Sequence, residues 1–106
     1  MFANSVGGRS MATFTVRVEM YAVRNYNELN KYMREAGFRR VITVGDIRRY
    51  LPRGEYTFGR YETVDGVLKL AKLAAAKTGH SHSILVTECM ARRTFNLKRV
   101  PSPPMA

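Results

Sequence analysis

The chain has 106 residues, of which 45% are hydrophobic, and this length suits one domain with a modest core better than two. Eighteen Lys and Arg residues against eight Asp and Glu residues give a formal charge of +10, which favours a polyanionic partner such as nucleic acid. The single cysteine, Cys89, excludes an intramolecular disulfide and a thiolate zinc cluster, and no apolar run approaches the roughly 20 residues that cross a bilayer. We therefore expect a soluble, cytoplasmic protein that needs no cofactor and contacts no membrane.

The first ten residues are rich in Asn, Ser and Gly and lack the apolar core of a signal peptide. They are expected to form a flexible leader over residues 1–10. The patterned part of the chain begins at Met11, so the folded domain is expected to cover residues 11–89. Residues 90–106 carry several basic side chains and three prolines, which predicts a basic C-terminal arm.

Residues 13–20 alternate between polar and apolar side chains, which is the pattern of a strand with one buried face. The side chains that should face the core are Phe14, Val16, Val18 and Met20. A helix is predicted next, from about residue 26 to residue 36. Asn25 and Glu28 resemble a capping box at its start, and Gly37 supplies a C-terminal stop.

A β-hairpin is predicted after this helix. Residues 38–44 and 47–51 are rich in strand-forming residues and flank a Gly-Asp turn at residues 45–46. Pro52 interrupts the second strand, because proline cannot donate a hydrogen bond to a β-ladder. We expect that strand to be bulged or to lie at a sheet edge there, and to resume over residues 55–58.

A second helix and a last strand complete the predicted domain. Thr63 can cap a helix that ends at Gly79. Its apolar face is expected to consist of Val64, Val67, Leu68, Ala71, Ala74 and Ala75. Residues 81–88 alternate again and predict the last core strand. Beyond it, residues 94–100 are expected to form either an extra short strand or a partner-binding arm.

The predicted order is strand, helix, strand, strand, helix, strand, which is typical of a ferredoxin-like α+β sandwich with an antiparallel sheet. Such a sheet buries one face under its helices and leaves the other open. On the first strand the open face would carry Thr13, Thr15, Arg17 and Glu19. The sheet also has edge strands, so we expect a homodimer.

Arginines concentrate in the middle of the chain, where seven lie between Arg34 and Arg60. Guanidinium groups can form two hydrogen bonds to one phosphate, so the cluster predicts binding to the nucleic-acid backbone. The predicted contact residues are Arg17, Arg39, Arg40, Arg48, Arg49 and Arg53. The alternative is a solvated basic face without a partner.

Four segments of the sequence carry a resemblance to a known family. They are Met-Ala-Thr-Phe-Thr-Val-Arg-Val-Glu at 11–19, Gly-Phe-Arg-Arg-Val-Ile-Thr at 37–43, Leu-Pro-Arg-Gly-Glu-Tyr at 51–56 and Ile-Leu-Val-Thr-Glu at 84–88. These segments resemble small proteins related to the endoribonuclease antitoxin (GhoS-type) of type V toxin-antitoxin systems. The resemblance implies a ferredoxin-like fold, similar to that of CRISPR adaptation nucleases, and cleavage of a toxin messenger RNA.

The resemblance supplies no catalytic residue. The CRISPR adaptation nucleases hold metal with an aspartate at the end of their first strand, where this chain has Glu19, Met20 and Tyr21. This difference speaks against metal-dependent cleavage, and no metal site is expected.

Metal-free cleavage of RNA needs a base, an acid and a cation for the charge that develops at phosphorus. The arginines can supply the cation, and His80, His82 and Tyr56 are the candidate acids and bases. The two histidines would share one face of a strand. His82 is also in phase with Ile84 and Val86, which favours a packed position at the edge of the core.

Two hypotheses follow from the sequence. The first is an RNA-binding, antitoxin-like protein that acts on mRNA as a metal-independent endoribonuclease. The second is a non-enzymatic regulatory module of phage or plasmid origin that binds nucleic acid or a protein through the same surface.

Overall fold

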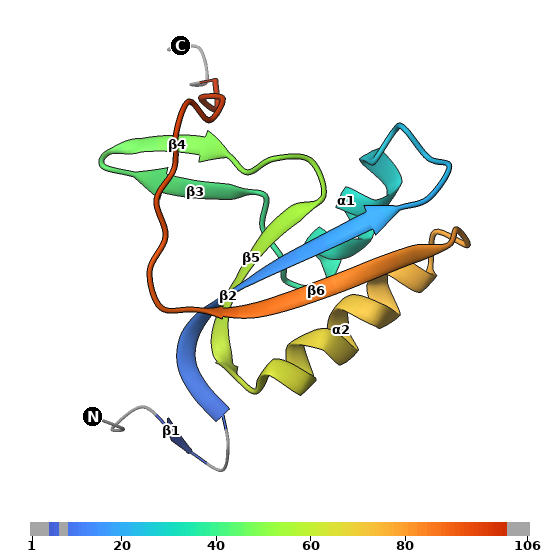
Figure 1. Ribbon diagram of the computed structural model, residues 1–106, viewed down its shortest axis with the longest axis horizontal. Helices are drawn as coiled ribbons and strands as arrows, with labels where there is room; N and C mark the ends of the chain where they lie inside the picture. The colour runs from blue at the N-terminus through green and yellow to red at the C-terminus, as the bar shows by residue number, and fades with distance from the viewer. Residues whose placement is uncertain (1–4, 7–8, 102–106) are drawn as a thin grey trace.

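The computed structural model describes residues 5–6 and 9–101. These residues form an α+β domain in which two helices cover one face of the larger of two antiparallel sheets (Figure 1). The rest of the expected leader, residues 1–4 and 7–8, and residues 102–106 of the expected arm lie outside the described residues. Neither described helix is long and apolar enough to cross a membrane.

The larger sheet is built around β2 (Arg9–Met20). β5 (Glu55–Glu62) pairs with one side of β2 and β6 (His82–Cys89) with the other, both antiparallel, and β1 (Ser5–Val6) pairs with the first residues of β2. The strand predicted over residues 13–20 is therefore confirmed. It begins earlier than expected, at Arg9, so the last two residues of the expected leader belong to β2.

The smaller sheet is a hairpin of β3 (Val41–Val44) and β4 (Ile47–Tyr50), as the Gly-Asp turn predicts. Gly45 has φ +63°, which suits glycine at this turn. The C-terminal segment lies along β4, where the Tyr50 N–H donates to the Lys98 carbonyl (2.8 Å) and the Val100 N–H to the Arg48 carbonyl (2.9 Å). The extra strand expected over residues 94–100 is thus a short bridged pairing and not a full strand.

The prediction that the second hairpin strand continues from residue 47 to residue 58 is wrong. The chain leaves the small sheet at Leu51, turns at residues 52–54, and enters the larger sheet as β5. Gly54 makes this turn with φ +85°, and a Cβ there would lie 2.5 Å from the Val18 carbonyl oxygen. Proline and glycine together therefore divide one predicted strand between two sheets.

Within residues 9–101, a backbone bridge joins the segment before β3 to β5 of the larger sheet. Arg39 and Thr57 exchange backbone hydrogen bonds of 2.9 and 2.7 Å. The strand expected to begin at Phe38 begins only at Val41, because Phe38 turns into the core, where it is 1% exposed.

Both helices lie close to their predicted positions: α1 spans Asn27–Glu35 and α2 spans Val64–Ala76. Thr63 caps α2 as predicted, since the Gly66 N–H donates to its hydroxyl oxygen (2.9 Å). The capping box of α1 is not formed. Tyr26 is the N-cap, and the Asn25 side chain instead accepts from the Asn27 N–H (2.8 Å).

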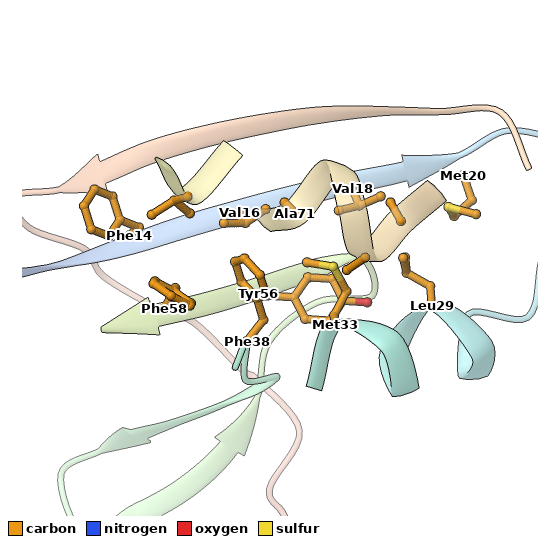
Figure 2. Packing of buried hydrophobic residues seen from close by; sticks show 13 residues of the cluster. Phe14, Val16, Val18, Met20, Leu29, Met33, Phe38, Tyr56, Phe58 and Ala71 are labelled. Atoms are coloured by element: carbon orange, nitrogen blue, oxygen red, sulfur yellow. The ribbon is translucent and has the colours of Figure 1, made fainter. Parts of the chain in front are cut away.

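The core lies between the helices and one face of the larger sheet (Figure 2). The four apolar residues predicted from the alternation of β2 are all buried, whereas Arg17 and Glu19 are exposed on the opposite face. On α2 four of the six residues predicted for the apolar face are buried, whereas Val64 is 39% exposed and Leu68 is only half-buried. The buried residues of the cluster are Phe14, Val16, Val18, Met20, Leu29, Met33, Phe38, Tyr56, Phe58, Val67, Ala71, Ala74 and Ala75.

Candidate nucleic-acid interface

A cavity of about 470 Å³ lies between the end of α1 and the β3–β4 hairpin. Four arginines line it, and they come from three parts of the chain. Arg34 is in the last turn of α1, Arg39 and Arg40 follow the helix, and Arg48 is on β4. We call this site the arginine pocket; its other lining residues are Asn30, Phe38, Val41 and Tyr50.

The local fold explains why these arginines converge. α1 ends at Glu35, and Gly37, which follows the C-cap residue Ala36, has a φ of +100° that turns the chain sharply back toward the larger sheet. Phe38 then inserts into the core against Phe58, with ring centroids 4.7 Å apart. With Phe38 fixed, the next two residues emerge beside the last turn of the helix, and the hairpin brings Arg48 to the same cavity.

Arg40 occupies the centre of this basic region. Its guanidinium lies 5.3 Å from the centroid of the Tyr50 ring, in a cation–π contact. Among the described residues, its Nε is the one buried side-chain nitrogen or oxygen without a hydrogen-bond partner. A buried donor without an acceptor costs about 1–3 kcal/mol, so an anion that reached this nitrogen would be stabilised.

The electrostatics of the arginine pocket favour an anion. No aspartate or glutamate is among its described lining residues. Three of its arginines, Arg34, Arg39 and Arg48, are exposed to solvent and Arg40 is half-buried. Four like charges around one cavity repel one another, and a bound phosphate would relieve that repulsion.

A second cavity of about 390 Å³ adjoins the first, because Arg40 and Tyr50 line both. Arg53 and Lys98 add two further cations to it, and its other lining residues are Leu51, Pro52, Asn96 and Leu97. Its described lining residues also include no carboxylate. The two cavities therefore form a continuous basic surface that runs from α1 to the C-terminal segment.

Two of the predicted phosphate-binding arginines also hold the chain itself. The Arg49 guanidinium donates from Nη1 to the Leu97 carbonyl (2.8 Å) and so anchors the C-terminal segment. The Arg53 guanidinium donates to the Arg24 carbonyl (3.0 Å) and lies 5.0 Å from the centroid of the Tyr26 ring. Their hydrogen bonds to carbonyls leave the positive charge in place, so both still add to the basic field.

Arg17 lies apart from the arginine pocket. It is exposed on the open face of the larger sheet, directly across the β2–β5 pairing from Glu55. The structure thus brings together three of the six predicted arginines in the first cavity, Arg39, Arg40 and Arg48, and adds Arg53 in the second.

The candidate acids and bases do not line the arginine pocket. His82 is half-buried and pairs with Met20, the last residue of β2. The Arg39–Thr57 bridge lies level with Thr15, because Thr15 pairs with Thr57. His82 is therefore five residues along β2 from the bridge. Its Nδ1 lies 2.7 Å from the carbonyl oxygen of the exposed His80. Figure 1 shows this end of β6 on the opposite side of the domain from the hairpin.

Tyr56 lies behind the cavity wall. Its side chain is fully buried, and its hydroxyl donates to Asn30 Oδ1 (2.6 Å). Burial raises the pKa of the Tyr56 phenol well above its ordinary value, and the nearby Arg40 charge opposes this only partly. Tyr56 is therefore a positioning residue that fixes the Asn30 amide, which lines the pocket.

Replacing Tyr56 by phenylalanine should lower the free energy of unfolding by about 1 kcal/mol at pH 7, because Asn30 loses its donor. The pKa of the phenol is higher in the folded chain, so its stabilising contribution is complete below about pH 10 and is lost as the pH rises further. The Tyr56→Phe variant should lack this alkaline loss. Urea titrations at neutral and alkaline pH measure both effects.

Tyr21→Phe is the matched control, since Tyr21 is 49% exposed. It should unfold like the wild type at both pH values. An alkaline loss of the same size in Tyr56→Phe and in wild type would contradict the role of the buried phenol.

Asn30, Arg34, Tyr50 and Lys98 line the two cavities and were not among the predicted contact residues. A signal for two of them is present in the sequence, because Asn30 and Arg34 are four residues apart and share one face of α1. That signal does not reveal that this face borders the same cavity as the hairpin, which depends on tertiary structure.

No protein-family model matches the chain, and a search of curated proteins finds no match.

Proposed function

We propose that this protein binds RNA through the phosphate backbone and that the arginine pocket is the main contact. The observation that supports this most directly is the convergence of four arginines on one cavity without a carboxylate among its described lining residues. Guanidinium groups can each donate two hydrogen bonds to phosphate oxygens. Arg40 lines both cavities, and its buried Nε has no hydrogen-bond partner within the protein.

The shape of the basic surface suits a strand better than a single ion. Two adjoining cavities share Arg40 and Tyr50, so successive phosphates could contact the pocket and then Arg53 and Lys98. Tyr50 offers an aromatic surface between them, and bases stack on such rings without sequence preference. Single-stranded RNA fits this arrangement because its bases are free to stack.

The geometry supports binding more strongly than cleavage. The histidines lie at the other end of the larger sheet, and the Tyr56 hydroxyl is buried and committed to Asn30. An antitoxin-like protein that captures a messenger RNA needs only the arginines. The mRNA of a toxin is the target that the sequence resemblance suggests.

The order of the strands supports the ferredoxin-like fold that the sequence resemblance implies. The central order β6, β2, β5, with both helices on one face, agrees with three of the four strands of a ferredoxin-like sheet. We propose that the Arg39–Thr57 bridge marks the place of the fourth strand, next to β5. The chain that continues from this bridge, β3, leaves the larger sheet and pairs with β4 in the smaller one. In this view the splayed hairpin is what opens the arginine pocket.

Binding should weaken steeply with salt. For four phosphate contacts on a single strand, the logarithm of the binding constant should fall with the logarithm of salt concentration with a slope near −3, at about −0.7 per contact. Fluorescence anisotropy of a labelled single-stranded RNA measures this slope, and a single-stranded DNA of the same sequence tests the preference for RNA. The recovered RNA should remain full-length with and without chelator.

A slope near zero, or no binding at low salt, would contradict the proposal. Chelator-resistant cleavage that disappears in a His80→Ala, His82→Ala variant would instead support the endoribonuclease.

A further inference from the structure

β6 is an edge strand without the usual protection against pairing. It has eight residues and pairs with β2 on one side, and no described strand pairs with its other side. Natural sheets protect such edges with lysine, proline, bulges or short strands. His82–Cys89 contains no lysine or proline and its pairing with β2 is continuous, and its one acidic residue, Glu88, lies next to the end of the strand.

The direction of the backbone groups on β6 follows from its pairing with β2. The Tyr21 N–H donates to the Ser81 carbonyl (2.9 Å), so this opposed pair is a hydrogen-bonded one. In an antiparallel pair, hydrogen-bonded and non-hydrogen-bonded positions alternate. The odd residues of β6 therefore bond toward β2, and the even residues direct their N–H and C=O groups outward. The outward set is His82, Ile84, Val86 and Glu88.

A second copy of the chain can satisfy these outward groups only in certain registers. A two-fold pairing must set even residues opposite even residues, so that the hydrogen bonds form and the faces match. One such register centres on Leu85. It sets Ile84 opposite Val86 of the other copy and Ser83 opposite Thr87.

The side chains favour this register over its neighbours. Moving it by one pair in either direction sets Leu85 opposite Ser83 or Thr87, whereas the centred register sets Leu85 opposite itself. Leu85 is 64% exposed on the open face of the sheet. Directly opposed residues at a non-hydrogen-bonded position have Cα atoms about 4.5 Å apart, so the two leucines would bury each other.

We propose that this chain forms a two-fold dimer in which β6 pairs antiparallel with β6 of a second copy, with Leu85 at the symmetry axis. The two larger sheets then form one continuous sheet. β6 is the edge opposite β5, and the hairpin joins at β5, so the two arginine pockets lie at the outer ends of the dimer. An RNA long enough to reach both would be held bivalently.

Leu85→Lys sets two like charges opposite each other at the axis. Because the side chain is already exposed, the monomer should stay folded, and light scattering should show the mass fall from two chains to one. Leu73→Lys is the matched control: Leu73 is 62% exposed on α2, and this variant should remain a dimer. A monomeric wild type, or a dimeric Leu85→Lys, would overturn the proposal.

Cysteine cross-linking tests the register directly. In a Cys89→Ser background, Leu85→Cys should form an intermolecular disulfide on mild oxidation, because Cα atoms about 4.5 Å apart suit that bond. Ser83→Cys should not cross-link, and the Ser83→Cys, Thr87→Cys double variant should. A dimer that cross-links through Ser83→Cys alone, or that fails to cross-link through Leu85→Cys, would show a different interface.

RNA affinity of the Leu85→Lys monomer for a short strand should stay within about twofold of wild type. The dimer proposal and the RNA-binding proposal can therefore be contradicted independently of each other.

Discussion

Reversing the charge at Arg39 and Arg48 together should lower the affinity for single-stranded RNA by about 100-fold or more at moderate salt. Both side chains are exposed and line the arginine pocket from different segments, one after α1 and one on β4. A hydrogen bond to a charged group contributes about 1.5–3 kcal/mol, and each glutamate would also repel the phosphate. Anisotropy titrations of the Arg39→Glu, Arg48→Glu variant against wild type measure the loss.

The matched control is Lys69→Glu with Lys72→Glu. Both lysines are exposed on α2, away from the arginine pocket, and the change in net charge is the same. This variant should lose no more than about threefold, through the long-range field alone. An equal loss in the two variants would mean that RNA recognises net charge and not the pocket.

Phe38→Ala should cause the largest loss of stability among the residues that shape the site. Phe38 is 1% exposed and packs against Phe58, so its truncation leaves a cavity in the core. Such substitutions typically cost about 3–5 kcal/mol, which is a large fraction of the stability of a small domain. Urea unfolding followed by circular dichroism measures the change.

RNA affinity of Phe38→Ala, measured under conditions where the variant is still folded, should also fall, because this ring positions Arg39 and Arg40. Phe95→Ala is the control for stability. Phe95 is 91% exposed, and its truncation should change the free energy of unfolding by less than about 0.5 kcal/mol. A stable Phe38→Ala variant that binds RNA normally would contradict the account of how the pocket is built.

Side-chain periodicity predicted most of the elements. The alternation in β2 correctly gave its buried face, and the pattern of α2 gave its buried residues and its Thr63 cap. These features depend on residues close together in the chain, so local sequence is enough to identify them. The capping box predicted at Asn25 does not form, because the Asn25 side chain accepts from the Asn27 N–H, one residue before the Glu28 N–H that a capping box uses.

The division of the hairpin was harder to predict. Pro52 and Gly54 were visible as an interruption, but a bulge and a change of sheet produce the same local signal. What distinguishes them is the close approach of Gly54 to the Val18 backbone, a contact between residues 36 positions apart. Such contacts belong to the tertiary structure.

Composition and periodicity are enough to predict a small, strongly basic α+β domain whose arginines concentrate in its middle third. Which of these arginines lie together depends on the tertiary structure. It separated Arg17, tied Arg49 to the C-terminal segment, and added Arg34 from α1 to the pocket. Net charge can be summed along a sequence, whereas a binding site requires side chains from distant segments to meet at one cavity.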